Sequence, residues 1–283
     1  MTDALVKKKI REMLAEDIGS GDVTTEILVS PKLKIHAEII AGQGGVVAGV
    51  REALEVFRQM GVKGKILKSD GEHVREGDVI ITLAGPARSI LSSERVALNL
   101  MMRMSGIATA TKKLIDLARR RNPKIMIAAT RKTAPLLTCF DKRAVVVVGG
   151  QPHRYKLSDH ILIKDNHLRI AGSVFEAVNR AKSMARGVKI EVEVSTSQEA
   201  LDAARAGADI VMLDNMKPAE IIRAVKLLER EGLRDKVLLE ASGRIDTSNV
   251  GDFAATGVDV ISSSYMTMRA PALDMSLEVK RKS

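Results

Sequence analysis

The sequence predicts an α/β fold built around a βα barrel, and three observations carry this prediction. From about Gly106 onward, short apolar segments alternate with helical segments through short links, which is typical of a parallel sheet of βα units. Six such units follow one another, and the glycine-rich loop 42–45 does not continue into a dinucleotide-binding motif, so a barrel is favoured over an open sheet. The N-terminal third has a different, β-prone texture, which indicates a second region.

The N-terminal region is predicted to open with a helix and to continue as a small sheet. A helix over residues 2–17 would place Val6, Ile10, Met13 and Leu14 on one face. The β-prone runs that follow are 34–40, 46–50, 65–68 and 79–83, with one helix at 51–60 that Gly61 closes. The segment 70–79 is similar to the turn of lipoyl and biotinyl carriers, but it lacks their exposed lysine motif and is better explained as a β-turn.

The elements of the predicted barrel follow in regular order. The strands are expected at 125–129, 161–163, 188–194, 210–213, 237–239 and 258–262, and the helices at 106–121, 173–186, 197–206, 217–231 and 247–255. Residues 144–148 are ambiguous, because their β-branched side chains favour a strand whereas the glycines at 149 and 150 suit the end of a helix.

Composition excludes several classes of protein. No apolar run of this 283-residue chain approaches the roughly 20 residues needed to span a bilayer, and the first residues lack the apolar segment of a secretory signal. Cys139 is the only cysteine, so neither an intrachain disulfide nor a zinc ribbon can form. These features predict a cytoplasmic protein without a membrane partner.

The basic charge of the chain leaves two classes of partner open. The 45 Lys and Arg residues outnumber the 35 Asp and Glu residues, which gives a formal net charge of +10. Aromatic residues make up only 2% of the chain, whereas single-strand nucleic-acid binders stack bases on aromatic rings. The basic runs 7–9, 119–121 and 280–282 are short and suit solvated surfaces. A strongly anionic small substrate explains the charge as well as a nucleic acid does.

Polar and charged residues follow one predicted strand after another, and in a βα barrel these positions share the C-terminal mouth where catalytic groups lie. The cationic residues at or near this mouth are Arg131, Lys132, His153, Arg154 and Lys164. Glu193 and Asp214 offer hard oxygen ligands for Mg²⁺. Ser242-Gly243 and Ser262, Ser263 and Ser264 offer hydroxyl and backbone groups that suit a phosphate, and Thr130 is a further candidate for substrate binding. The residues alone therefore predict a site for Mg²⁺ and a polyphosphate beside a polyanionic small molecule.

A series of ordered motifs resembles the quinolinate phosphoribosyltransferase family, which decarboxylates quinolinate in de novo NAD synthesis. The resemblance runs almost end to end, through residues 16–25, 94–99, 105–109, 130–133, 149–154, 163–167, 191–194, 212–216 and 240–243. It implies a small open-faced α/β sandwich from residues 1–105, joined by 270–283, beside an incomplete α/β barrel from residues 106–269. It also implies a homodimer in which the first domain caps the partner's barrel and Arg95 reaches the partner's site.

The resemblance further implies a reaction and a set of roles. Phosphoribosyl pyrophosphate and quinolinate would give nicotinate mononucleotide, pyrophosphate and CO₂, with Mg²⁺ as cofactor. Lys132, Glu193 and Asp214 would be catalytic, the last two also holding ribose hydroxyls and Mg²⁺. The cations Arg131, Lys132, His153, Arg154 and Lys164 would bind the carboxylates and phosphates, and Ser242-Gly243 the 5′-phosphate.

The chain departs from the family pattern where the phosphate should bind. Arg244 stands where the family has a second glycine, and Ser263-Ser264 occupy the last strand-end loop where the family has glycine. We expect Arg244, Ser263 and Ser264 to contact substrate in compensation. The alternatives are a related transferase acting on nicotinate or another acid and, more remotely, a basic nucleic-acid-binding barrel. The Lys164–His167 motif and the cluster of Arg and Lys residues favour a dicarboxylic acid.

Further residues carry structural expectations. His160 and His167 have no third metal ligand at suitable spacing, and His167 is expected to fix the loop after Lys164. Glu191 shares a strand face with Glu193, but only Glu193 is assigned to the site; a pairing of Glu191 with a neighbouring lysine is an equally good interpretation. Cys139 is interpreted as an inert thiol and the methionines as core residues.

Overall fold

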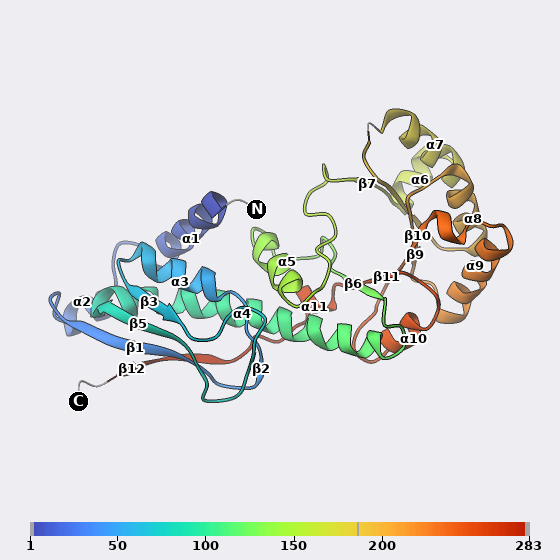
Figure 1. Ribbon diagram of the computed structural model, residues 1–283. Helices are drawn as coiled ribbons and strands as arrows, with labels where there is room; N and C mark the ends of the chain where they lie inside the picture. Colours follow the sequence, from blue (N-terminus) through green and yellow to red (C-terminus); the bar gives the residue numbers. More distant parts are fainter. Residues whose placement is uncertain (1–2, 186, 281–283) are drawn as a thin grey trace. The chain divides into compact units, whose positions relative to one another are not determined.

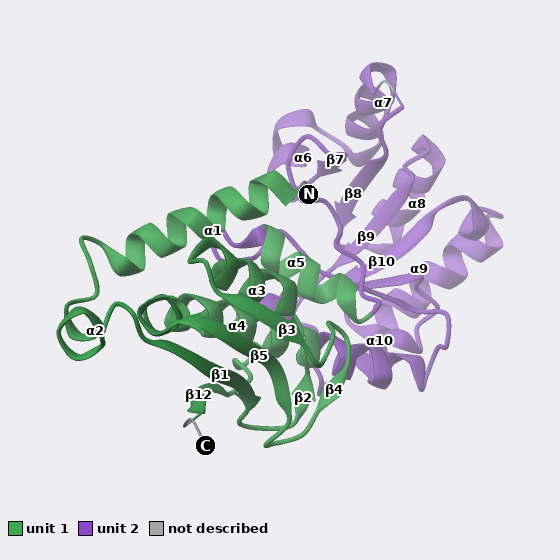
Figure 2. Cartoon of the chain, turned by 60° about the vertical axis from the view of Figure 1, so that its left-hand side comes forward, with its two compact units in different colours: residues 1–110, 139–148, 270–283 green, residues 111–138, 149–269 purple. Residues whose placement is uncertain are grey.

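The chain divides into two compact units in the computed structural model, which describes residues 3–185 and 187–280. Unit 1 comprises residues 1–110, 139–148 and 270–283, and unit 2 comprises residues 111–138 and 149–269 (Figure 2). The predicted domains divided the chain after residue 105 and placed 139–148 in the barrel. Both ends of the first predicted domain, residues 1–2 and 281–283, lie outside the described residues, as does most of the basic run 280–282.

Unit 1 is an antiparallel sheet covered by helices on one face. The strand order is β12-β1-β5-β3, with β1 at Lys34–Ala41, β3 at Lys63–Ile66, β5 at Val79–Pro86 and β12 at Met275–Lys280. Alternate residues of β1 are buried, because one side of the strand faces the core and the other does not. Helix α3 (Val50–Gln59) packs on β3 and β5, and α1 (Asp3–Ile18) packs on α3 (Figure 1).

Three local features of unit 1 differ from the sequence prediction. The predicted strand 46–50 is only the two-residue β2 (Gly45–Val46), which pairs with β4 (His73–Val74), since Gly49 at φ 86° turns the chain into α3. The short helix α2 (Val23–Leu28) was not predicted; the Asp22 carboxylate caps it by accepting from the Thr25 N–H at 3.0 Å. Strand β4 lies in the segment interpreted as a turn.

A single 33-residue helix, α4 (Ala87–Arg119), carries the chain from unit 1 into unit 2. The predicted helix from residue 106 is therefore its second half. At Gly106 a Cβ atom would lie 2.1 Å from the Pro271 carbonyl oxygen, so only glycine lets the C-terminal segment approach α4 so closely. This contact ties residues 270–280 to the first unit.

Unit 2 contains a six-stranded parallel sheet in the order β6-β11-β10-β9-β8-β7. The strands are β6 (Met126–Ala128), β7 (Ile161–Ile163), β8 (Ile190–Val194), β9 (Ile210–Asp214), β10 (Leu238–Ser242) and β11 (Val260–Ser262). In the described part of the chain β6 and β7 are the two outer strands of this sheet and do not pair with each other; beyond β6 there is only an isolated parallel bridge between Ala128 and Gln151, so the sheet stays open as an incomplete barrel. The predicted α/β fold class is confirmed, and each predicted strand overlaps an observed one.

Helices flank this sheet (Figure 1). They are α6 (Asp165–Ala171), α7 (Val174–Met184), α8 (Ser197–Ala206), α9 (Pro218–Arg230), α10 (Val250–Ala254) and α11 (Tyr265–Met268), with a 3₁₀ turn at Arg234–Lys236. In α9 the buried residues Ile221, Ala224, Val225 and Leu228 recur at helical spacing. The ambiguous segment 144–148 belongs to helix α5 (Thr138–Val147), most of which falls in unit 1.

The methionines only partly follow the expectation of a core role. Met101, Met104 and Met212 are buried, as are Met216, Met266 and Met275. In contrast, Met184 is 76% exposed and Met268 57% exposed. Thioether side chains fill irregular gaps in both units, but not at every position.

Candidate active site

A cavity of about 530 Å³ opens at the C-terminal ends of the strands of unit 2. A second cavity of about 200 Å³ adjoins it and shares Thr130, Lys132, Ser242, Gly243 and Arg244 with it. This is the mouth at which βα-barrel enzymes place their reacting groups. A space of several hundred cubic ångströms lined by few, convergent polar groups suits a small-molecule substrate.

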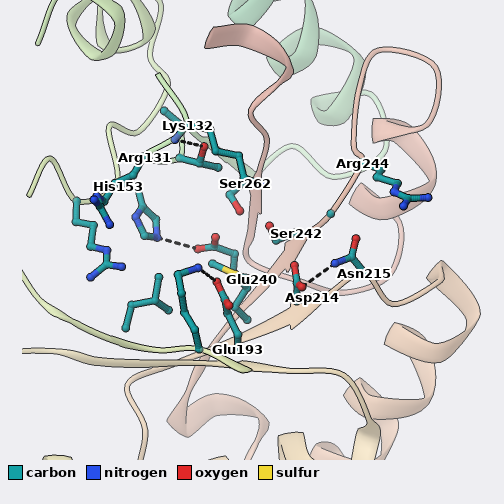
Figure 3. A pocket seen from close by; sticks show the side chains of 17 residues that line it. Arg131, Lys132, His153, Glu193, Asp214, Asn215, Glu240, Ser242, Arg244 and Ser262 are labelled. Atoms are coloured by element: carbon teal, nitrogen blue, oxygen red, sulfur yellow. Dashed lines mark hydrogen bonds and ion pairs between the residues drawn. The ribbon is translucent and has the colours of Figure 1, made fainter. Parts of the chain in front are cut away.

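The structure brings nearly all residues predicted for the site into these two cavities. The larger one is lined by Thr130, Arg131, Lys132, His153, Arg154, Lys164, Glu193, Asp214, Ser242, Gly243 and Arg244 (Figure 3). Ser263 and Ser264 line the smaller one. Arg95 lies on the part of α4 that belongs to unit 1, where its side chain is 60% exposed and 4.0 Å from the Glu94 carboxylate. Its approach to a partner chain stays a prediction.

The two predicted catalytic carboxylates end neighbouring strands. Glu193 on β8 forms an ion pair with Lys164, which directly follows β7. Asp214 ends β9 and accepts a hydrogen bond from Asn215 Nδ2 at 2.7 Å. Strands β8 and β9 are adjacent and parallel, so both carboxylates reach the same mouth.

The loop after β10 needs glycine because it passes against the loop after β9. Gly243 has φ 110°, and a Cβ atom there would lie 2.5 Å from Asn215 Oδ1. Asn215 itself has φ 54° and donates its N–H to the Ser242 carbonyl at 2.9 Å. Asparagine tolerates the left-handed region better than most residues. The Ser242-Gly243 backbone is thereby held at the edge of both cavities.

Backbone contacts hold Lys132 at the junction of the two cavities. The Lys132 N–H donates to Thr130 Oγ1 at 3.1 Å, and its carbonyl accepts from Thr267 Oγ1, on α11, at 2.7 Å. Lys164 is fixed similarly, since its N–H donates to His167 Nδ1 at 2.9 Å at the start of α6. The expected structural role of His167 is confirmed, although the segment is a helix rather than a loop.

The smaller cavity combines cationic side chains with hydroxyl groups. Arg244 adopts φ 51° with an exposed side chain, and Arg269 lines the same cavity. The Ser263 hydroxyl donates to the Ile245 carbonyl at 2.5 Å and accepts from the Tyr265 N–H at 3.0 Å, so it also braces the loop. Sequence reasoning missed Arg269, which follows α11 rather than a strand.

Behind the larger cavity, Glu191 lies between two histidines. Its carboxylate is fully buried and accepts hydrogen bonds from His153 Nε2 at 3.3 Å and His160 Nε2 at 2.8 Å. Burial alone would raise the pKa of Glu191, but the hydrogen bonds and positive charge of the two histidines lower it below its usual value. The predicted pairing of Glu191 with a lysine is wrong, because the chain folds His153 and His160 onto this side of β8.

Glu240 is a second buried carboxyl group, and it lines the larger cavity. It is 2% exposed, and its Oε1 atom has no hydrogen-bond partner among the residues that the structure describes. Burial and the neighbouring Glu191 raise the pKa of Glu240 to about 7. The charge of His153, whose Nε2 atom lies 3.8 Å from Glu240 Oε2, acts in the opposite direction and lowers this pKa (Figure 3). The sequence places Glu240 at a strand end, in the family motif 240–243, but it was given no role in the site.

The electrostatic character of the larger cavity is positive. Arg131, Lys132, Arg154 and Lys164 line it, and burial together with the charge of Arg131 lowers the pKa of Arg154. Glu193 on β8 and Asp214 at the end of β9 line the same cavity, and both offer the carboxylate oxygens that Mg²⁺ prefers. Two carboxylates fit a magnesium ion that is shared with substrate phosphates. The cavity can therefore hold a polyanion and a Mg²⁺–phosphate complex together.

Comparisons with known proteins agree with this geometry. The quinolinate phosphoribosyl transferase N-terminal domain matches residues 22–105, and the C-terminal domain of the same family matches residues 107–278. A probable nicotinate-nucleotide pyrophosphorylase (carboxylating) from Methanothermobacter thermautotrophicus is 46% identical over 272 residues, which cover 96% of this chain and 98% of that protein.

Two further relatives extend the comparison. The human nicotinate-nucleotide pyrophosphorylase (carboxylating) is 38% identical over 253 residues, covering 89% of this chain and 84% of that protein. The solved structure of the nicotinate-nucleotide pyrophosphorylase from Francisella tularensis has a TM-score of 0.91 at 38% identity, covering 99% and 98% of the two chains. The chain belongs to the quinolinate phosphoribosyl transferase family of enzymes, as its ordered motifs predicted.

Proposed function

We propose that this protein transfers the phosphoribosyl group of phosphoribosyl pyrophosphate to quinolinate and releases pyrophosphate and CO₂. The product is nicotinate mononucleotide. The observation that carries the proposal is the larger cavity, which five Lys or Arg residues line together with Glu193 and Asp214 in a chain of this family. The names of the relatives describe the same reaction written in the carboxylating direction.

The two ends of the site suit two different anions. Arg131 and Arg154 carry planar guanidinium groups, which pair with carboxylates through two hydrogen bonds. This end receives the dicarboxylic acid. The smaller cavity, with Ser242, Arg244 and Arg269, receives the 5′-phosphate of the sugar. Lys132 lines both cavities and so reaches the pyrophosphate between them.

The first chemical step is the departure of pyrophosphate from C1 of the ribose. Positive charge develops at C1 while negative charge builds on the leaving group. The carboxylates of Glu193 and Asp214 stabilise the sugar cation and its hydroxyls, and Lys132 stabilises the leaving pyrophosphate. Mg²⁺, when bound with the substrate through Glu193 and Asp214, adds further positive charge beside the pyrophosphate. The pyridine nitrogen of quinolinate then forms the new bond to C1.

The second step is decarboxylation. The new pyridinium ring draws electrons, so the bond between C2 and its carboxylate breaks and leaves the electron pair on C2. CO₂ departs, and a proton takes its place on C2. The residues of the acid end hold the remaining carboxylate during this step.

We also propose that the enzyme acts in the cytoplasm as a homodimer, with Arg95 completing the partner's site. The exposed Arg95 side chain supports this arrangement. In the described residues no helix is long and apolar enough to cross a membrane. Mixing an Arg95→Ala chain with a Lys132→Met chain tests the dimer, because only shared sites would restore activity to the mixture.

The reaction is tested with the full chain, Mg²⁺, phosphoribosyl pyrophosphate and either quinolinate or nicotinate, following CO₂ and mononucleotide. We expect both products with quinolinate and neither with nicotinate. Mononucleotide formed from nicotinate would overturn the proposed acid, and absence of turnover with both acids would overturn the proposed reaction. A nucleic-acid function would instead show binding that weakens steeply with salt.

A further inference from the structure

A buried hydrogen-bonded cluster lies directly behind the acid end of the larger cavity. Its centre is Glu191, which is 0% exposed and does not line the cavity. The carboxylate accepts from the ring nitrogens of His153 and His160, whose rings lie edge to face with their centres 5.1 Å apart. Of these three residues, only His153 lines the cavity. Glu191 therefore contacts the substrate pocket through another side chain.

The same cluster also reaches Arg154. The Arg154 guanidinium donates from Nη1 to the main-chain carbonyl of His160 at 3.3 Å. His160 in turn is fixed by its ring bond to Glu191 at 2.8 Å. One buried carboxylate thus holds two consecutive cavity residues: His153 directly, and Arg154 through His160.

The backbone at His153 requires such support. His153 has φ 53°, a left-handed conformation that side chains other than glycine adopt at a cost in free energy. Such strain persists only where the surroundings determine the conformation, and it concentrates at functional sites. The bond from His153 Nε2 to Glu191 supplies one such constraint, and it keeps the ring from turning freely within the cavity.

We propose that Glu191 and His160 are positioning residues that fix the His153–Arg154 pair for recognition of the substrate's adjacent carboxylates. This inference rests on the proposed function for the identity of the acid. Neither residue touches the substrate; they set how the cavity distinguishes a dicarboxylic acid from a monocarboxylic one. A charged hydrogen bond that is held in place by a buried partner gains affinity because less conformational freedom is lost on binding.

The test uses three variants of the full chain. Glu191→Gln keeps the size of the side chain but replaces the carboxylate, and His160→Phe keeps a ring but removes its donor. His160→Gln retains an amide donor toward Glu191 and should restore part of the function. Asp209→Asn is the matched control, because Asp209 accepts the Ile190 N–H at 2.7 Å at the opposite end of the same strand.

Two measurements separate a positioning role from a general loss of structure. The first is the KM for quinolinate beside the KM for phosphoribosyl pyrophosphate. The second is the Kd of benzene-1,2-dicarboxylate, an unreactive dicarboxylic acid without the ring nitrogen. For Glu191→Gln and His160→Phe we expect both acid constants to rise by about 10-fold or more, which is the order expected for misplaced charged hydrogen bonds. The KM for phosphoribosyl pyrophosphate should change by less than about twofold. For His160→Gln, the KM for quinolinate and the Kd of the dicarboxylate should lie between those of wild type and those of His160→Phe.

The outcomes are distinguishable. If Asp209→Asn raises the acid constants as much as Glu191→Gln does, the cluster is structural and the inference is overturned. The three ligand atoms of His153, His160 and Glu191 also lie within 4.8 Å of one another, as in a metal site. Loss of dicarboxylate binding in EDTA without Mg²⁺ would therefore overturn it in favour of a bound metal. If the wild-type chain binds benzene-1,2-dicarboxylate but does not turn over quinolinate, the proposed reaction is refuted, and the Kd values of the variants still decide the inference. If the wild-type chain binds neither quinolinate nor benzene-1,2-dicarboxylate, the proposed reaction and the inference are both overturned.

Discussion

The two ends of the active-site cavity are built in different ways. At the acid end, Arg154 is only 6% exposed and His153 is anchored to a buried carboxylate. At the phosphate end, Arg244 and Arg269 are exposed, and their charges lie at the tips of flexible side chains. A rigid, buried network discriminates between acids by their shape and by the direction of its hydrogen bonds. Exposed arginines instead attract phosphate groups through long-range electrostatics, with little geometric selectivity. Selectivity for the acid and affinity for the sugar phosphate therefore have separate structural origins.

The junction of the two ends is where a substitution should cost most. Lys132 lines both cavities, and its backbone is held by Thr130 and Thr267. Lys132→Met should lower kcat by about 10²- to 10³-fold, since the leaving pyrophosphate loses a charge that stabilises the transition state. Steady-state kinetics with quinolinate measure the effect. A loss confined to KM would instead assign Lys132 to binding alone.

A change at the acid end should affect only the acid. Arg131→Lys keeps the positive charge but removes the planar pair of donors that suits a carboxylate. We expect the KM for quinolinate to rise by about 10-fold with little change in the KM for phosphoribosyl pyrophosphate. Equal kinetics for Arg131→Lys and wild type would remove Arg131 from the acid end. The matched change Arg244→Lys should leave the acid constants unaltered.

At the phosphate end, Arg244→Gly separates charge from backbone strain. The substitution relieves the positive φ of 51° at this position, so the thermal midpoint should hold or rise slightly. The KM for phosphoribosyl pyrophosphate should rise by about 3- to 10-fold at low salt. At high salt the difference in KM between the variant and the wild type should become smaller, because exposed charges are screened. If the KM fell, close backbone approach rather than the arginine charge would govern phosphate binding.

The smallest effect we expect is the pH dependence of stability at Glu240. Its pKa is raised to about 7 in the folded protein from the ordinary value of 4.5, so the folded state binds the proton more tightly than the unfolded state does. The stability from this group is fully present below pH 4.5 and is lost as the pH rises through about 7. Glu240→Gln does not titrate, so its thermal midpoint relative to wild type should increase between pH 5 and pH 8. If the thermal midpoints of Glu240→Gln and wild type changed in parallel with pH, Glu240 would not carry this proton.

Much of the fold was predictable because its elements are encoded locally. The apolar runs of unit 2 are short and regularly spaced, and each observed strand overlaps a predicted one. The polar residues that follow them reach one mouth because parallel strands end on the same side. Helix α2 was missed, since Asp22 caps a helix of only six residues that shows little periodicity.

The pairings across the chain were not predictable in the same way. Sequence pattern predicted the strands, the order of the motifs, the family and the residues at the mouth, because periodicity and motif spacing are properties of neighbouring residues. Only the tertiary structure decided that residues 139–148 join the first unit and that Glu191 meets His153 and His160 rather than a lysine. These choices depend on which side chains the packed strands bring together over 31 and 38 positions. Their energies come from burial and hydrogen bonding in the folded chain, which no local pattern specifies.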